Sequence, residues 1–286
     1  GKKSQIAVNR NKTIPELIVS FTSYPARMKH LPTMVASVFN QTYAPGKTIL
    51  WLSEDQFPNG IQSVPQNVTD FIPKGLEIRF VQGDLKPHKK YYYAMQEFPD
   101  NPILTLDDDV SYASDTIEKL WKSYFEFPHA VSAMRTHRIS IVDGKIGKYN
   151  EWTQNDALFY RRPSFFALAT GVGGVLYPPN SIPKEAFDEK MITDLCLLGD
   201  DIWLKSMEIL AEIPVVSADI DVSLDYIKGT QDNALWKINQ AEGQNDVYFK
   251  TIEDGFERKK KGEVSSFQAL SATISASAGI GNIAGS

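Results

Sequence analysis

Cysteine and histidine are scarce in this sequence, and their scarcity narrows the chemistry that it can support. Its 286 residues include one cysteine, Cys196, so no disulfide bond can form within the chain. A reducing compartment is the simpler expectation, and Cys196 is expected to be a packed thiol rather than a nucleophile. The four histidines show no ligand spacing such as His-x-x-x-His, which argues against a zinc hydrolase.

Long apolar runs and a strong net charge are also missing. No run of about 18 strongly apolar residues occurs, and we find no N-terminal signal segment. We therefore expect a cytoplasmic protein, with peripheral contact at the inner face of the membrane as an open alternative. A net charge of −5 argues against a protein whose main role is to bind the nucleic acid backbone, so no nucleic acid partner is expected.

What is present is an ordinary globular composition, 42% hydrophobic and 23% charged, with strands and helices in alternation. Apolar runs typical of strands buried on both faces occur at residues 16–22, 48–52, 76–81 and 103–106. Apolar side chains at helical spacing occur between them, at residues 31–39 and 88–98. This order predicts an α/β fold with a mostly parallel central sheet and helices on both of its faces.

The second half of the chain has shorter and less regular signals. We expect helices at residues 115–125 and 198–210, strands at 130–134 and 214–218, and a hairpin over 137–152 that turns at 143–144. Residues 170–175 are rich in glycine, which indicates backbone that approaches a ligand or a tight turn into a strand. The polar tract after Asp219 has no assignable pattern.

Three consecutive aspartates, residues 107–109, follow the strand at residues 103–106. If strand alternation continues, Asp107 and Asp109 share one face and Asp108 points to the other. Carboxylates on one face repel each other unless a cation lies between them, and oxygen-only ligands suit Mg²⁺ or Mn²⁺. Ligands in open α/β sheets bind beyond the carboxyl ends of the strands. The triplet therefore predicts a metal site, with an idle, solvated acidic turn as the alternative.

Five motifs follow one another in a fixed order. They are Ser-Phe-Thr-Ser-Tyr-Pro at 20–25, Ser-Val-Phe-Asn-Gln-Thr at 37–42, Leu-Asp-Asp-Asp at 106–109, Thr-Gly-Val-Gly-Gly-Val-Leu-Tyr at 170–177 and Gly-Asp-Asp-Ile-Trp at 199–203. Each is weak alone. Together, over about residues 15–250, they resemble the GT-A fold glycosyltransferases, and most closely the bacterial family-2-like enzymes that extend cell-surface polysaccharides.

The resemblance implies one GT-A (Rossmann-like) domain over residues 15–253, preceded by a loose segment at 1–14. Its nucleotide-binding half would cover about 15–110 and its acceptor-binding half about 111–253. Residues 254–286 are expected to be a charged helix end and a flexible Ser/Ala/Gly tail or linker, which could lead to a further domain. The implied partners are a nucleotide-sugar donor, with UDP expected, and a glycan or lipid-linked glycan acceptor.

The resemblance also implies roles for two acidic groups. Asp107 and Asp109 match the family's Asp-x-Asp element, whose carboxylates bind a divalent cation, Mn²⁺ or Mg²⁺, on the diphosphate and contact the ribose, with Asp108 in the same donor site. Asp200 and Asp201 match the position where many inverting members place Glu-Asp, with the aspartate as general base. Because Asp200 stands in place of the glutamate, either carboxylate could be the base. No candidate for a third metal ligand is evident.

The residues themselves are compatible with base catalysis. An acceptor hydroxyl has a high pKa and needs a base as it attacks. Asp200 and Asp201 lie at a predicted helix start, where we expect Asp200 to cap the helix and Asp201 to take the proton. Repulsion between the two carboxylates would raise one pKa, which favours this chemistry.

Six further residues are candidates for binding the donor. They are Lys89, Lys90 and Arg27 for the phosphates, and Thr22, Tyr24 and Glu54 for the base and ribose. The two lysines could equally be exposed residues at a helix start, and the tyrosine a packed turn residue. Trp152, Trp203 and Trp236 could stack on sugar rings, although Trp203 fits the core better.

Three functions fit this pattern. The leading one is a metal-dependent, inverting glycosyltransferase of the hexosyltransferase type that acts on a bacterial surface polysaccharide. A nucleotidyltransferase that makes sugar nucleotides shares the sheet and the acidic site, but such enzymes usually carry a glycine-rich, basic loop after the first strand, and residues 22–27 contain no glycine. A carbohydrate-binding module without catalysis is the third, and the two acidic groups argue against it.

Overall fold

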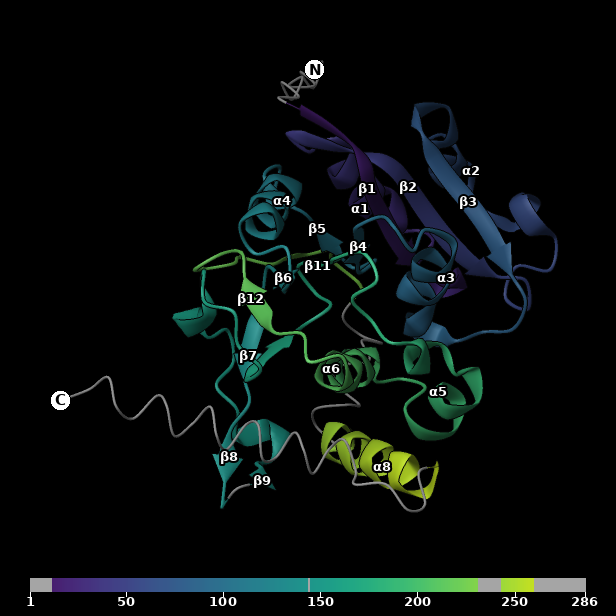
Figure 1. Cartoon of the computed structure of the whole chain (residues 1–286). Helices are drawn as coiled ribbons and strands as arrows, with labels where there is room; N and C mark the ends of the chain where they lie inside the picture. Colours follow the sequence, from purple (N-terminus) through teal and green to yellow (C-terminus); the bar gives the residue numbers. More distant parts are fainter. Residues whose placement is uncertain (1–11, 144, 231–242, 260–286) are drawn as a thin grey trace.

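A seven-stranded sheet runs through the centre of the molecule (Figure 1). The computed structural model describes residues 12–143, 145–230 and 243–259. The strands lie in the order β12–β6–β11–β4–β1–β2–β3. Their bounds are Lys12–Thr22 (β1), Tyr43–Ser53 (β2), Leu76–Val81 (β3), Ile103–Leu106 (β4), Val131–Ala133 (β6), Val175–Tyr177 (β11) and Val215–Ser217 (β12). β11 is antiparallel to β4 and β6 and the other pairs are parallel, so the prediction of a mostly parallel sheet is confirmed.

Helices and short strands complete the fold. The helices are α1 (Leu31–Phe39), α2 (Gln66–Thr69), α3 (Lys89–Glu97), α4 (Thr116–Glu126), α5 (Glu189–Leu195), α6 (Asp200–Leu210) and α8 (Gln244–Lys259). Small two-stranded sheets pair β5 (Val110–Ser111) with β13 (Asp225–Tyr226), β7 (Thr136–Arg138) with β10 (Ala167–Ala169), and β8 (Ile141–Val142) with β9 (Lys145–Ile146). No helix in the described ranges is long and apolar enough to cross a membrane.

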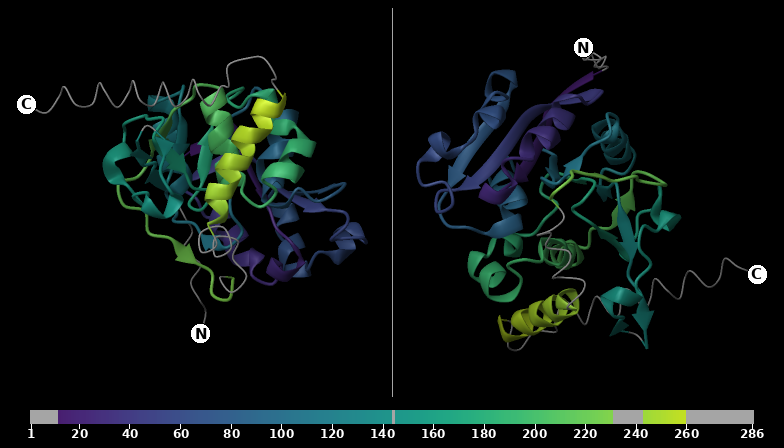
Figure 2. Two further views of the ribbon diagram at one scale, coloured as in Figure 1. Left: turned by 90° about the horizontal axis from the view of Figure 1, so that it is seen from below. Right: turned by 180° about the vertical axis from the view of Figure 1, so that it is seen from behind.

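Helices cover both faces of the sheet, which confirms the predicted α/β class (Figures 1 and 2). On one face, Val19 of β1 and Leu104 of β4 are buried in a cluster with side chains of α1 and α4. On the other face, Ile18 and Ile103 pack with Ala94 of α3. Alternate residues of one strand therefore meet helices on opposite sides. This two-sided burial explains why each central strand is an unbroken apolar run in the sequence.

The C-terminal part of the described chain is packed against the domain. α8 contacts α5 and α6 (Figure 1). Its Tyr248, Phe249 and Ile252 belong to the same apolar cluster as Trp203 of α6. The boundary placed at residue 253 from the sequence therefore falls inside a helix.

Two further details differ from the sequence expectations. β1 begins at Lys12, so the last residues of the segment predicted as loose already pair with β2. Within residues 137–152, β8 and β9 form the hairpin, but β7 pairs with β10 instead of joining it. Tertiary pairing with a strand far along the chain has replaced the local partner.

We predict that Leu104→Ala lowers the free energy of unfolding by roughly 2–5 kcal/mol, because it leaves a cavity between the sheet and its helices. Leu104 is fully buried, at 0% exposure. Urea unfolding followed by circular dichroism measures the change. Ile61→Ala, at a side chain 45% exposed, is the control and should change the free energy by less than about 0.5 kcal/mol. An equal loss in the two variants would contradict this packing.

Candidate active site

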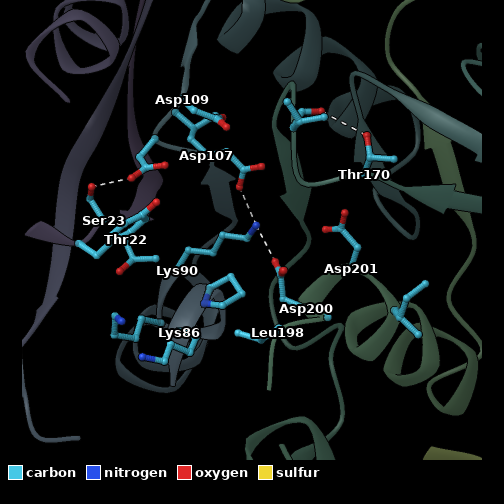
Figure 3. A pocket seen from close by; sticks show the side chains of 18 of the residues that line it. Thr22, Ser23, Lys86, Lys90, Asp107, Asp109, Thr170, Leu198, Asp200 and Asp201 are labelled. Atoms are coloured by element: carbon cyan, nitrogen blue, oxygen red, sulfur yellow. Dashed lines mark hydrogen bonds and ion pairs between the residues drawn. The ribbon is translucent and has the colours of Figure 1, made fainter. Parts of the chain in front are cut away.

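A cavity of about 610 Å³ opens at the carboxyl ends of the central strands (Figure 3). Its lining comes mainly from the segments that follow β1, β3 and β4 and from the start of α6. These strand ends are where the sequence predicted ligand binding, because parallel strands bring their carboxyl ends to one edge. The segment after β2 contributes Gln56 but not Glu54, which is exposed in the turn and does not line the cavity.

The three aspartates at 107–109 lie in a turn rather than in a strand. β4 ends at Leu106, so strand alternation stops before Asp107. All three residues line the cavity, and the Asp108 and Asp109 carboxylates contact the same arginine, Arg27, so the prediction that Asp108 points to the opposite side from Asp109 is wrong. The Tyr112 hydroxyl holds the turn, because it accepts the Asp107 N–H at 2.8 Å and donates to the Asp107 carbonyl at 3.0 Å.

Arg27 neutralises two of these carboxylates. It ends a short 3₁₀ helix, Pro25–Arg27, that follows β1. Its Nη1 lies 3.0 Å from Asp108 Oδ1 and 3.2 Å from Asp109 Oδ2. Burial lowers the pKa of Arg27, but the two carboxylates outweigh burial and raise it, so the guanidinium stays charged. Burial also raises the pKa of Asp108, to about 6, even though Arg27 opposes the shift.

Lys90 connects the aspartate triplet to a second acidic group. Its Nζ lies 2.7 Å from Asp107 Oδ1 and 2.6 Å from Asp200 Oδ2, and its side chain is 4% exposed (Figure 3). Burial alone would lower the pKa of this ammonium, but Asp107, Asp200 and Asp201 raise it well above its usual value. Lys90 is therefore a buried cation shared by both acidic groups, and the alternative of an exposed lysine is wrong.

The pair Asp200 and Asp201 begins α6 without capping it. Gly199 is the N-cap residue and no side chain caps the helix, so the predicted capping role of Asp200 is wrong. Lys90 explains the difference, since it draws the Asp200 carboxylate into an ion pair. Asp201 has another partner, because its Oδ1 accepts the Gly171 N–H at 2.9 Å.

The two adjacent carboxylates have opposite pKa shifts. Burial raises the pKa of Asp201 to about 8, and the charge of Asp200 adds to the effect. Burial acts in the same direction on Asp200, but the charge of Lys90 outweighs it and lowers the pKa of that carboxyl. Near neutral pH, Asp200 is therefore ionised while Asp201 retains a proton that it can exchange.

Gly171 lies where these charges meet. A Cβ at this position would be 2.6 Å from Lys90 Nζ and 2.9 Å from Asp201 Oδ1, which is closer than van der Waals contact. A side chain here would push the ammonium or the carboxylate away. The glycine that the sequence predicted to approach a ligand thus allows the charged groups of the site to come together.

Other residues predicted to bind the donor also reach the cavity. Thr22 and Tyr24 line it, and the Thr22 hydroxyl donates to the Trp51 carbonyl at 2.8 Å. Lys89 lines it as well, where Asp84 pairs with the ammonium. Burial lowers the pKa of Lys89, although Asp84 opposes the shift.

Sequence reasoning missed part of the cavity lining. Single polar and aromatic residues from short strands, turns and loops of the second half of the chain form this part: Arg135, His137, Tyr149, Gln154 and Tyr226. None belongs to a motif, so the sequence carried no signal for them. Asp84 differs, because it lies in the segment 83–90 after β3, where the sequence did predict a site. The tryptophans expected to stack on sugars do not contribute, because Trp152 and Trp203 are buried in the core. Trp236 lies outside the described residues.

The carboxylates of the triplet could supply some, but not all, of the ligands of a hard divalent cation. Mg²⁺ commonly binds one or two carboxylates together with substrate phosphates and water. In the described ranges, no three His, Cys, Asp or Glu side chains are arranged to hold a metal by themselves. Asp107 and Asp109 would thus supply some of the ligands, and they would have to exchange Lys90 and Arg27 for the cation.

Comparison with known proteins finds only distant structural likenesses. No protein-family model and no curated protein sequence matches it. Among solved structures, S. aureus TarS 1-349 in complex with UDP is 13% identical with a TM-score of 0.45, over 73% of this chain and 59% of that one. The mannosyltransferase PcManGT from Pyrobaculum calidifontis in complex with GDP-Man and Mn2+ is 12% identical with a TM-score of 0.46, over 97% and 84%. A 4-diphosphocytidyl-2C-methyl-D-erythritol synthase is 11% identical with a TM-score of 0.45, over 83% and 98%. These likenesses are too distant to assign an activity.

We predict that Lys90→Met lowers the free energy of unfolding by roughly 3–5 kcal/mol, because Asp107 and Asp200 lose the buried cation between them. Methionine keeps the apolar stem of the lysine side chain, so the loss of stability measures the contribution of the ammonium charge. Urea unfolding measures it. Lys47→Met removes a lysine paired with Glu77 at the surface and should cost less than about 1 kcal/mol.

A double variant adds a second check on Lys90. Asp200→Asn in the Lys90→Met background removes one of the stranded carboxylates and should recover part of the lost stability. Equal stability of the Lys90→Met and Lys47→Met proteins would show that Lys90 is not the counter-ion of the buried acids.

Proposed function

We propose that this chain is a metal-dependent, inverting glycosyltransferase. It would transfer a sugar from a nucleoside diphosphate, UDP in our expectation, to a hydroxyl group of a glycan or lipid-linked glycan such as a bacterial surface polysaccharide. The observation that carries the proposal is the pair of acidic groups in one cavity, the triplet at 107–109 and the pair at 200–201, joined by Lys90. Glycosyl transfer must stabilise a leaving diphosphate and deprotonate a hydroxyl, and each task suits one of these groups.

In this proposal the donor occupies the half of the cavity next to β1, β3 and β4. The candidates that line this half are Thr22 and Tyr24 for the base and ribose, and Arg27, Lys89 and Lys90 for the phosphates. The two ammonium groups and the guanidinium are paired with aspartates, so the diphosphate would compete for them with Asp84, Asp107 and Asp108. Glu54 is left out, because it lies away from the cavity.

A divalent cation, Mn²⁺ or Mg²⁺, is part of the proposal. Asp107 and Asp109 would hold it, and when bound it would neutralise charge that develops on the leaving diphosphate. The chain supports this role by fixing the turn of the triplet through Tyr112. Arg27 and Ser23 hold Asp108 beside the other two carboxylates.

Asp201 is the proposed general base. The Gly171 N–H orients its Oδ1, and a pKa of about 8 is close to the working range of a base near neutral pH. Asp200 stays ionised beside Lys90 and helps to keep the pKa of Asp201 raised. A base that acts on the acceptor hydroxyl implies a single displacement, which inverts the anomeric configuration.

A panel of nucleotide sugars, incubated with glycan acceptors and assayed for the nucleoside diphosphate, tests the proposal. We expect release that EDTA abolishes and that Mn²⁺ or Mg²⁺ restores, and Asp109→Asn should lower it roughly 10²-fold or more. A nucleotidyltransferase would instead release pyrophosphate from a nucleoside triphosphate, and a binding module would release neither product. Full activity in EDTA would remove the metal from the proposal.

We predict that kcat/KM for transfer rises with pH up to about 8, because the base works only when deprotonated and Asp201 holds its proton up to about that pH. Asp201→Asn should abolish this dependence and lower kcat by roughly 10²–10⁴-fold, with donor affinity little changed. Asp200→Asn is the matched variant and should retain more activity. A product of retained configuration, or a profile that is flat in the wild type, would contradict the assignment.

A further inference from the structure

Arg135 differs from the other cationic side chains of the cavity. Four of these pair with an aspartate of the same cavity: Arg27, Lys86, Lys89 and Lys90. Arg135 has no carboxylate partner within the part of the chain that the structure describes. Its Nε donates to the side-chain oxygen of Asn155. The two terminal nitrogens of its guanidinium make no hydrogen bond with the described residues, so they remain available to a ligand.

The backbone holds Arg135 close to the proposed base. The Arg135 carbonyl accepts the Thr170 N–H at 3.1 Å, and the next residue, Gly171, donates its N–H to Asp201 at 2.9 Å. Two consecutive peptide groups therefore fix both residues. A ligand whose hydroxyl lies at Asp201 can extend to Arg135 within the same cavity.

A hydrogen bond orients the side chain of Arg135. Asn155, which accepts its Nε–H, has its own N–H bound to His137 Nδ1 at 3.2 Å. Burial, helped by the charge of Arg135, lowers the pKa of His137 to about 4, so this ring is neutral. Burial raises the pKa of Tyr149 and Tyr226, so neither phenol is ionised near neutral pH. These aromatic neighbours of the guanidinium are thus uncharged and do not act as its counter-ion.

We propose that Arg135 binds an anionic group of the acceptor, a phosphate or a carboxylate on the molecule whose hydroxyl meets Asp201. The inference rests on the proposed function and adds to it the chemical class of the acceptor. The terminal nitrogens of an arginine form a planar fork that matches either anion with two parallel hydrogen bonds. Arg135 is the cation suited to an anionic acceptor, because the other four cationic side chains of the cavity already pair with its aspartates.

Binding measurements test this inference without relying on turnover. Glucose 6-phosphate, glucuronate and glucose serve as probes in isothermal titration calorimetry, with UDP and Mn²⁺ present. We expect at least one charged probe to bind the wild type about tenfold or more tightly than glucose, and Arg135→Gln to remove this preference. Preference for the phosphate or for the carboxylate identifies which anion the acceptor carries.

Arg161→Gln is the matched control. It makes the same charge change at a surface arginine that pairs with Glu126 and does not line the cavity, so the preference should persist. Glucose binding as tightly as both charged probes, or a preference that survives Arg135→Gln, would overturn the inference.

The proposed function fails separately, in the nucleotide-sugar panel. If the protein cleaves no nucleotide sugar and still prefers a charged probe through Arg135, the anion site is supported and the proposal of glycosyl transfer is contradicted. If the protein cleaves nucleotide sugars but shows no such preference, glycosyl transfer is supported and the inference of an anionic acceptor is contradicted.

Discussion

The buried ammonium of Lys90 is the interaction on which the site depends. Asp107 follows the carboxyl end of β4, in the middle of the sheet, and Asp200 lies at the start of α6. The Lys90 ammonium contacts their carboxylates at 2.7 and 2.6 Å, respectively. Two carboxylates this far removed from water would repel each other strongly without a cation between them. One side chain therefore holds the two halves of the cavity together, and the absence of a side chain at Gly171 makes room for it.

Most of the charged side chains in the cavity belong to such ion pairs. Arg27 forms ion pairs with Asp108 and Asp109, and Lys90 forms ion pairs with Asp107 and Asp200. Two groups differ from this pattern. Asp201 holds a proton near neutral pH, and Arg135 has neutral neighbours. Among the described residues, the two groups that we assign to the acceptor are thus the aspartate and arginine side chains of the cavity that stand outside these ion pairs.

Local sequence rules succeeded where burial is local. β4 and α1 have the predicted bounds, because two-sided burial gives an unbroken apolar run and one-sided burial gives helical spacing. The same rules failed where a distant residue decides. Strand alternation did not extend to Asp108, since the strand ends before the triplet. Asp200 forms an ion pair with Lys90, a residue remote in sequence, instead of capping the helix. Arg135 lies outside every motif and reaches the cavity only through folding.

The reversed direction of β11 decides which loops can influence ligand specificity. Val175 pairs with Thr105 and Tyr177 with Ile103, so the chain enters β11 at the edge where β4 ends. The loop at 170–174, which precedes β11 in the chain, therefore lies at the cavity. In a strand of the opposite direction, three residues long, that loop would begin about 10 Å away, at the far edge of the sheet. Length variation before β11 would consequently reshape the ligand site, whereas variation after Tyr177 would emerge at the other edge and leave the site unchanged.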